Sequence, residues 1–309
     1  MHNGSAPGAG ERDGPERGER DGAADGGAAR PRPAATVMLL RPAGTGRFPA
    51  DGADRSGTGA DGPMEVLLMR RVRSMGFAPG AFVFPGGGVD ERDTDGGVPW
   101  TGPAPEEWAR TLGTDVPMAR ALVCAAVRET FEETGVLLAS EPERADAEVI
   151  TLDTDTEEWE RDRLGLIDRS RSFTEVLSRR GLVLRSEWLR AWSRWVTPKS
   201  EPRRYDTWFF AAELPPGQAS RDVGGEADLT CWTDPAGVAS EWEAGRMPML
   251  LPTAVSCAEL ADRRTLRGVR EARRDIVPIE PVIRKVDGQV RVVAPNGVDY
   301  PLPKPGAAP

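Results

Sequence analysis

Short apolar runs and segments of helical periodicity follow one another along the chain. Runs of alternating or clustered apolar residues predict strands at residues 34–42, 64–71, 190–198 and 203–214, and a hairpin within 280–297. Apolar residues that recur every three to four positions predict helices at 105–113, 116–134 and 251–269, and residues 226–238 predict a strand, a turn and a helix. This interleaved order is typical of a three-layer α/β/α domain.

Composition divides the chain further. Residues 1–33 contain almost nothing apolar, which predicts a disordered leader, or a leader added by an upstream start codon. The main domain is expected at 34–300, with a short tail at 301–309. Within it, polar residues at about 94–116 indicate an insertion, and mixed charges with helical spacing at about 140–188 indicate a helical insertion. The strands at 34–42 and 64–71 are expected to form a hairpin with a long connection.

The helix expected at 116–134 carries three glutamates close together. At about 100° per residue, Glu129, Glu132 and Glu133 point within one arc of roughly 100°. Like charges four residues apart cost a helix about 0.2–0.5 kcal/mol, which Arg128 offsets only partly by its i, i+4 pairing with Glu132. Such a group of carboxylates suits Mg²⁺ or Mn²⁺, and a solvated charged face is the alternative. The opposite side of the helix carries Val123, Val127, Thr130 and Phe131.

Charge and residue counts exclude several classes of function. The net charge of −9 argues against binding to nucleic acid or an anionic membrane, so an anionic substrate must be held by local cations. The chain lacks both a run of about 18 apolar residues and the apolar region of a signal peptide, which favours a cytoplasmic protein. The only histidine is His2, which excludes Ser-His-Asp and Cys-His catalysis and His-ligated metals. Three distant cysteines indicate reduced core thiols: Cys124, Cys231 and Cys257.

Two segments together resemble a known motif. The glycine turn "FPGGGVD" (84–90) and the segment "RETFEETGV" (128–136) resemble the two halves of the Nudix box, G-x5-E-x7-R-E-U-x-E-E-x-G-U, where U is a bulky aliphatic residue. Gly87 takes the first glycine position, and Thr130 departs slightly from the first U position. Asp93 stands where the family has glutamate, and 34 residues rather than seven separate it from Arg128.

The interruption, together with "VLLMRRVRSMGFAPGAFVFPGGGVD" and "RRYDTWFFAAELP", resembles the acyl-coenzyme A diphosphatase branch of the Nudix hydrolases. Lengthening a surface loop about fivefold adds only about 1–2 kcal/mol, so the insertion is tolerable. The resemblance implies a Nudix-type α/β/α sandwich with a mixed central sheet and helical insertions.

The resemblance also implies roles for individual residues. Glu129, Glu132 and Glu133 would bind Mg²⁺ or Mn²⁺ with the Gly87 carbonyl, while Arg128 would hold the glutamates in place. Asp93 would take over part of the work of the missing glutamate. A later glutamate often acts as base or extra ligand in the family. Glu226 is the candidate here, with Asp228 or simple surface placement as alternatives.

Candidate substrate-binding residues lie near these segments in the sequence. Local cations are needed for a pyrophosphate, and an aromatic ring could stack on a base. The candidates are Arg71, Arg73, Phe77 and Arg204. Further candidates nearby are Arg70, Arg203, Phe82, Trp208 and Phe209. For each of the arginines solvated surface is the alternative, and burial in the core is expected for at least two of the four aromatic residues.

The implied reaction is metal-dependent hydrolysis of a pyrophosphate bond. The favoured substrate is coenzyme A or acyl-coenzyme A, giving 3′,5′-ADP and (acyl-)phosphopantetheine. ADP-ribose, NADH or a nucleotide sugar is the second alternative, and a non-catalytic nucleotide sensor is the third. Two roles are considered for the insertion at about 94–116: a lid over the site, or a contact in a homodimer.

Overall fold

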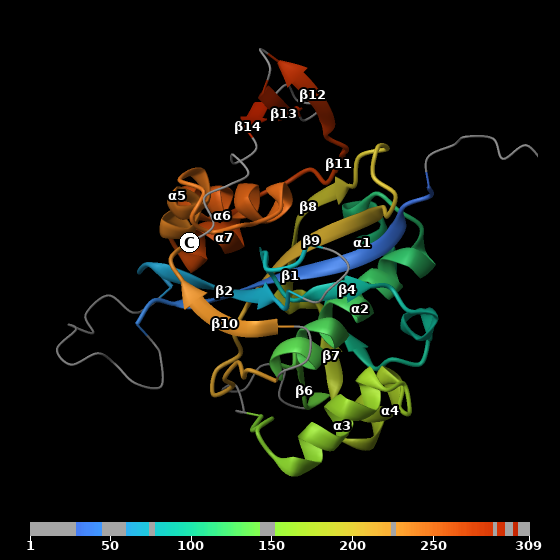
Figure 1. Ribbon diagram of the computed structural model, residues 1–309. Coiled ribbons are helices and arrows are strands. Elements are labelled where there is room, and N and C mark those ends of the chain that lie inside the picture. The colour runs from blue at the N-terminus through green and yellow to red at the C-terminus, as the bar shows by residue number, and fades with distance from the viewer. Residues whose placement is uncertain are drawn as a thin grey trace, which may run out of the picture.

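The computed structural model describes residues 29–44, 60–73, 78–142, 152–223, 227–286, 289–293 and 299–301. A central mixed sheet runs through the molecule in the order β10-β2-β1-β9-β8-β11, with β3 paired to β2 and β4 paired to β1 (Figure 1). Its strands are β1 Arg32–Pro42, β2 Met64–Arg71, β3 Phe82–Val83, β4 Gly86–Gly88, β8 Leu189–Val196, β9 Tyr205–Glu213, β10 Ala227–Thr233 and β11 Pro278–Ile279.

The central strand β1 explains why the sheet is buried on both faces. Ala35, Val37 and Leu39 belong to one apolar core, while Met38 and Leu40 belong to a second core on the other face. Apolar residues on both faces of a strand read as a continuous hydrophobic run, as in "AATVMLL". β1 pairs antiparallel with β2, as expected for the hairpin, and parallel with β9.

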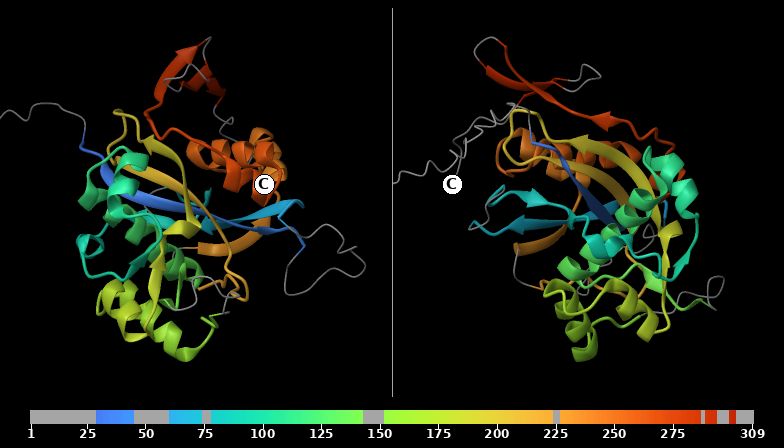
Figure 2. Two further views of the ribbon diagram at one scale, coloured as in Figure 1. Left: turned by 180° about the vertical axis from the view of Figure 1, so that it is seen from behind. Right: turned by 90° about the vertical axis from the view of Figure 1, so that its right-hand side faces the viewer.

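Helices cover both faces of this sheet, which confirms the three-layer expectation (Figures 1 and 2). One face carries α1 Pro105–Leu112, α2 Val116–Thr134, α3 Glu157–Ile167 and α4 Phe173–Arg179. The other face carries α5 Pro235–Glu243, α6 Leu251–Arg263 and α7 Leu266–Glu271. The helix expected at 251–269 is therefore divided, and the chain turns at Arg264 with φ +65°.

The helix α2 begins and ends where local signals predict. Asp115 caps its N-terminus by accepting a hydrogen bond from the Met118 N–H, and Gly135 ends it with φ +73°. The helix is less one-sided than expected, because successive residues such as Leu122, Val123 and Cys124 are all fully buried. It lies between β1 and the outer helices α1 and α3, so apolar residues are needed around most of its circumference.

Two small sheets complete the fold. β5 Trp100–Thr101, β7 Val183–Arg185 and β6 Ala139–Ser140 form one sheet, so the region 140–188 contains strands as well as the expected helices, along with the 3₁₀ turn Ser186–Trp188. β12 Val282–Val286, β13 Gln289–Val293 and β14 Asp299–Pro301 form the other, at the opposite end of the molecule from α3 and α4 (Figure 2). β12 and β13 pair antiparallel, as the expected hairpin requires.

The three cysteines agree with the expectation of reduced thiols. All three cysteines are free, and burial raises the pKa of both Cys124 and Cys257 to about 12. Among the described residues, no helix has the length and apolar character needed to cross a membrane.

Candidate active site

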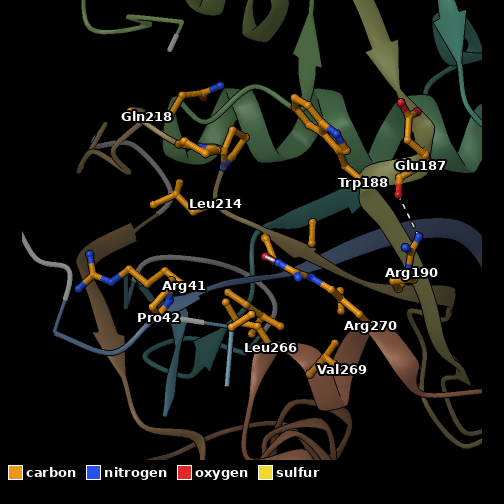
Figure 3. A pocket seen from close by; sticks show the side chains of 18 residues that line it. Arg41, Pro42, Glu187, Trp188, Arg190, Leu214, Gln218, Leu266, Val269 and Arg270 are labelled. Carbon is orange, nitrogen blue, oxygen red and sulfur yellow. Dashed lines mark hydrogen bonds and ion pairs between the residues drawn. The ribbon is translucent and has the colours of Figure 1, made fainter. Parts of the chain in front are cut away.

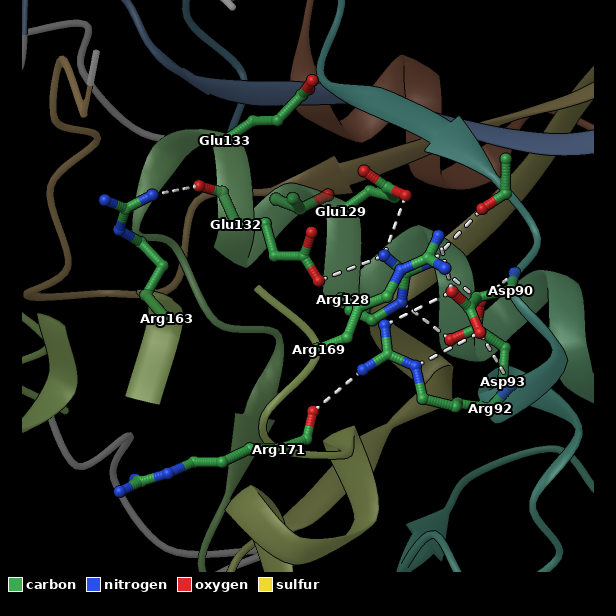
Figure 4. A network of polar contacts seen from close by, with 12 residues as sticks. Asp90, Arg92, Asp93, Arg128, Glu129, Glu132, Glu133, Arg163, Arg169 and Arg171 are labelled. Carbon is green, nitrogen blue, oxygen red and sulfur yellow. Dashed lines mark hydrogen bonds and ion pairs between the residues drawn. The ribbon is translucent and has the colours of Figure 1, made fainter. Parts of the chain in front are cut away.

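The glycine turn and the acidic helix meet directly. β4, which lies within the glycine turn, pairs with β1 and packs against α2. The backbone N–H of Gly86 donates to Oε2 of Glu133 at 2.7 Å. A Cβ added at Gly87 would lie 2.6 Å from Cδ of Glu129, so only glycine leaves room for that carboxylate. The two halves of the interrupted motif are therefore in contact (Figure 4).

Arg128 links these elements through a single guanidinium group. Its Nη1 donates to Oε1 of Glu129 at 2.8 Å and to Oε1 of Glu132 at 3.1 Å. Its Nη2 donates to the carbonyl of Gly88 at 3.2 Å, which connects the helix to the turn. The expected positioning contacts of Arg128 with Glu129 and Glu132 are therefore present, and the i, i+4 ion pair with Glu132 is one of them.

Asp93, which stands at the glutamate position of the motif, makes contacts that hold the motif together. It is only 1% exposed and forms a two-pronged ion pair with Arg128, at 2.8 Å to Nε and 2.7 Å to Nη2. It also accepts a hydrogen bond from the Asp90 N–H and so caps the 3₁₀ helix η1 Glu91–Thr94. Because Asp93 joins η1 to α2, it closes the two halves of the motif across the insertion rather than facing the cleft.

Burial and charge shape the ionisation of this group. Burial raises the pKa of Glu129 to about 7, although Arg128 works in the opposite direction. Burial likewise raises the pKa of Glu132, again against the effect of Arg128. Burial alone would lower the pKa of Arg128, but its hydrogen bond to Asp93 and the nearby carboxylates raise it above the ordinary value. One guanidinium therefore compensates only part of the negative charge gathered here.

The donor set fits a hard divalent cation in its chemistry. Three carboxylates from one turn of α2 and the backbone of a glycine turn surround one cleft, and oxygen donors of this kind suit Mg²⁺ or Mn²⁺. Among the described residues, no three acidic, histidine or cysteine side chains are already closed into a metal cluster. In Figure 4, Glu129 and Glu132 turn toward Arg128, whereas Glu133 turns toward the glycine turn.

A polar cleft of about 610 Å³ opens above the three glutamates. One wall is formed by η1 and the residue before it, including Asp90 and Arg92, and another by the end of α3 and the turn that follows it. From the latter, Arg163 donates to the backbone carbonyl of Glu132 at 2.7 Å, and Arg169 pairs with Asp90 at 3.3 Å. Sequence reasoning missed these arginines, because nothing local in "ERDRLGLIDRS" indicates that the inserted helix packs beside the box.

A second, more apolar cleft of about 720 Å³ lies on the other side of the glycine turn. Gly88, Glu129 and Glu133 line both clefts, so the acidic group stands where the two meet. The apolar walls of the second cleft are Val83, Phe84, Trp195, Phe209, Leu250 and Leu251.

Of the three arginines predicted to bind substrate, only Arg71 lines one of the two clefts. Arg71 lines the apolar cleft, whereas Arg73 is exposed and is not among the residues lining either cleft. The prediction that Arg204 binds substrate is wrong. Arg204 is buried, and its three nitrogens donate to the carbonyls of Thr197 and Ala29 and to the carboxylate of Glu280. A guanidinium used in this way fastens the start of β1 to the β8–β9 turn and does not reach a substrate.

The structure describes several of the other candidate residues, and two lie outside the described part of the chain. Trp208 and Phe209 are buried, as expected for at least two of the aromatic residues, although Phe209 also lines the apolar cleft. Asp228, the alternative to Glu226, is exposed and pairs with Arg70 at 2.7 Å. Phe77 and Glu226 lie outside the described residues, so both stay predictions.

A separate cavity of about 630 Å³ lies beside α7 and the end of β9 (Figure 3). None of the glutamates of the acidic helix lines it. Arg270 and Glu213 in its wall form an ion pair with each other, and Arg190 donates to the backbone carbonyl of Glu187. Because these groups are already paired with each other, we do not assign the reaction to this cavity.

Comparison with known proteins agrees with the geometry. The chain is 27% identical over 215 residues to the acyl-coenzyme A diphosphatase NUDT19 of Xenopus laevis, which covers 59% of this chain and 56% of that protein. It is 32% identical over 177 residues to the human protein of the same name, covering 47% and 46%. The chain thus spans about half the length of these curated relatives.

A solved structure and a family profile extend the comparison. The Nudix hydrolase from Alicyclobacillus acidocaldarius superposes with a TM-score of 0.59 and 26% identity, covering 80% of this chain and 98% of that one, which confirms the expected fold. The profile of the NUDT19 Nudix domain matches residues 99–255, which is just over half of the chain and includes the whole of α2. The chain therefore belongs to the NUDT19 Nudix domain family of Nudix hydrolases.

Proposed function

We propose that this chain hydrolyses the pyrophosphate bond of coenzyme A or acyl-coenzyme A, giving 3′,5′-ADP and (acyl-)phosphopantetheine. The single observation that carries the proposal is the contact between the glycine turn and the acidic helix, in which the missing side chain of Gly87 leaves room for the Glu129 carboxylate. The choice of substrate rests on the relatives named as acyl-coenzyme A diphosphatases.

Glu129, Glu132, Glu133 and the carbonyl of Gly87 would hold Mg²⁺ or Mn²⁺. A divalent cation bound there would neutralise pyrophosphate charge and lower the pKa of a water molecule. Burial raises the pKa of Glu129, and a nearby cation favours the charged carboxylate again. Arg128 would keep Glu129 and Glu132 directed toward the cleft through its two hydrogen bonds from Nη1.

The chain's other residues would bind and orient the substrate. Arg169, at the rim of the polar cleft, would attract the phosphates, since its side chain is 73% exposed and pairs only at 3.3 Å with Asp90. Glu226 remains our proposed general base. Val223 and Ala227, which flank it in the sequence at a short distance, line the polar cleft.

The test is product analysis by mass spectrometry over a panel of pyrophosphates with Mg²⁺ or Mn²⁺, with and without a chelator. We expect the wild-type protein to cleave coenzyme A species, and we expect Glu132→Gln to lower kcat/KM on the order of 10³-fold because a charged oxygen donor is lost. Glu241→Gln is the matched control, since Glu241 lies on α5, away from the cleft, has a side chain 45% exposed and pairs with Arg246 beyond the helix end.

The panel separates the alternatives. A clear preference for ADP-ribose, NADH or a nucleotide sugar would keep the reaction and change the substrate. Tight binding of one nucleotide without turnover of any compound would indicate a sensor and contradict the proposed activity.

A further inference from the structure

The acidic group stands at the boundary of two clefts that differ in chemistry. Gly88, Glu129 and Glu133 line both, so a ligand whose pyrophosphate lies at the glutamates can extend into each cleft at once. The polar cleft carries Arg92 and Arg169 at its rim. Its partner carries aromatic and aliphatic walls from β3, β8, β9 and the start of α6.

The apolar cleft exposes hydrophobic surface beside charged carboxylates. Leu250 is 37% exposed and lies next to Leu251 at the N-terminus of α6. Trp195 and Phe209 line the same cleft from the sheet. Its volume of about 720 Å³ lies within the usual range for small-molecule sites, which are mostly apolar with a few polar groups.

Charge decides which end of a substrate suits which cleft. Apart from the shared glutamates, the charged residues lining the apolar cleft are Arg71 and Glu201, which have opposite signs. A phosphorylated nucleotide there would lose hydration without gaining a cluster of cations, whereas a hydrocarbon chain would leave water for apolar walls. The nucleotide is therefore better matched to the polar cleft.

We propose that the apolar cleft binds the pantetheine arm together with the acyl chain of acyl-coenzyme A and makes the enzyme prefer longer chains over free coenzyme A. This inference rests on the proposed function, which supplies the substrate class. Leu250 is a specificity-determining residue in this arrangement, and the glycine turn divides the acyl part of the site from the nucleotide part.

Chain-length dependence gives the first test. With Mg²⁺ present, kcat/KM is measured for coenzyme A and for its acetyl, butyryl, hexanoyl and octanoyl thioesters. Each buried methylene favours binding by up to about fourfold, so kcat/KM rises about three- to tenfold for each two-carbon extension until the cleft is filled.

The variant Leu250→Asp gives the second test without weakening the fold. Leu250 occupies the N-cap of α6 with φ −73° and ψ 149° and makes no side-chain cap bond, and aspartate is a favoured residue at that position. The carboxylate would stand at the apolar wall, so the ratio of kcat/KM for octanoyl-coenzyme A to that for coenzyme A falls at least tenfold. Leu250→Trp, which narrows the cleft, moves the preferred chain to a shorter length.

Ala104→Asp is the matched control. Ala104 is the N-cap of α1 with φ −65° and ψ 156°, it makes no side-chain cap bond either, and α1 also has proline in its first turn. Its substitution leaves the chain-length ratio unchanged. Melting temperatures of both variants, measured alongside, report on the fold.

Each outcome decides the inference. A rising profile that Leu250→Asp flattens supports it. An active enzyme with a flat profile, or an equal loss for both substrates in Leu250→Asp, overturns the acyl cleft and leaves the proposed function in place. No turnover of any coenzyme A species by the wild type overturns both.

Discussion

The two clefts differ in how their walls are built. The polar cleft is enclosed by η1, by the end of α3 from the helical insertion and by parts of α2, β2 and β10, and is held by ion pairs such as Arg128 with Asp93. The apolar cleft is enclosed by strands of the central sheet and the N-terminus of α6, and its walls are side chains of the second hydrophobic core. Under the proposal, charge handling and apolar recognition therefore rest on different walls of the site, with the glutamates between them.

This difference makes the two clefts separable by mutation. A change in the polar cleft alters steps common to every coenzyme A substrate, so the ratio of kcat/KM for octanoyl-coenzyme A to that for coenzyme A stays constant. A change in the apolar side chains that wall the second cleft alters that ratio. The ratio is therefore the quantity that each variant below is expected to leave unchanged.

The largest effect is expected for Arg128→Met, which removes the charge but keeps much of the side-chain volume. Asp93, only 1% exposed, would be left as an uncompensated buried carboxylate, and loss of one partner of a buried pair costs about 3–5 kcal/mol. Denaturant unfolding measures that loss. Turnover of all substrates falls with it, because Glu129 and Glu132 lose the donor that orients them.

Arg163→Met is the control for this variant. Arg163 is also buried, but its ion-pair partner Glu160 has a side chain 35% exposed and can be rehydrated. The expected loss of unfolding free energy is about 1–2 kcal/mol, mainly from the hydrogen bond to the Glu132 carbonyl. Equal losses in the two variants would mean that burial of Asp93 is not what makes Arg128 important.

A smaller and more selective effect is expected for Gly87→Ala. The added Cβ would meet the carboxylate of Glu129, which is the end of a flexible side chain, so the fold remains and the carboxylate moves by about 1 Å. Displacement of that size costs about 10²-fold in kcat/KM for every substrate. Steady-state kinetics and a melting curve together separate loss of activity from loss of fold.

The neighbouring glycines are the controls for this prediction. A Cβ at Gly86 would lie 2.4 Å from the Ala35 carbonyl oxygen and 2.7 Å from the Thr36 Cα, both backbone atoms, so Gly86→Ala lowers the unfolding free energy by about 3 kcal/mol. A Cβ at Gly88 meets nothing within 4 Å, so Gly88→Ala stays within about 0.5 kcal/mol. Unfolding of Gly87→Ala as severe as that of Gly86→Ala would contradict the assignment.

Local signals explain which parts of the molecule could be predicted from the sequence. Gly135 marked the end of α2, and Asp234 with Pro235 marked the start of α5, because caps act within a few residues. The continuous apolar runs in β1 and β2 indicated their burial directly. The placement of the three glutamates at one cleft followed from helical periodicity alone.

Long-range contacts explain what the sequence could not supply. The bonds of Arg204 to Ala29 and Glu280 span 175 and 76 residues, so its structural use is invisible locally. The pairing of Asp93 with Arg128 spans 35 residues and depends on how the insertion folds. The wall contributed by α3 depends likewise on the buried carboxylate of Asp162, which pairs with Arg171, Arg179 and Arg180.

The smallest effect is expected for Arg169→Gly, which tests the polar cleft on its own. Arg169 has φ +65°, a conformation that costs most residues about 1 kcal/mol and glycine very little, so the variant keeps or slightly gains stability. Loss of the guanidinium lowers kcat/KM for coenzyme A by about tenfold, and for dephospho-coenzyme A by less, because the proposed arrangement puts the nucleotide with its 3′-phosphate in the polar cleft that Arg169 lines.

Arg264→Gly is matched to this variant in backbone and chemistry. Arg264 is an exposed arginine with the same φ of +65°, at the end of α6 and outside the residues that line either cleft. The Arg264→Gly variant is expected to lose the same backbone strain and to keep kcat/KM unchanged for both substrates. If Arg169→Gly, like Arg264→Gly, left the discrimination between coenzyme A and dephospho-coenzyme A unchanged, the nucleotide would have to bind elsewhere than beside Asp90. That result would contradict the assignment of the nucleotide to the polar cleft.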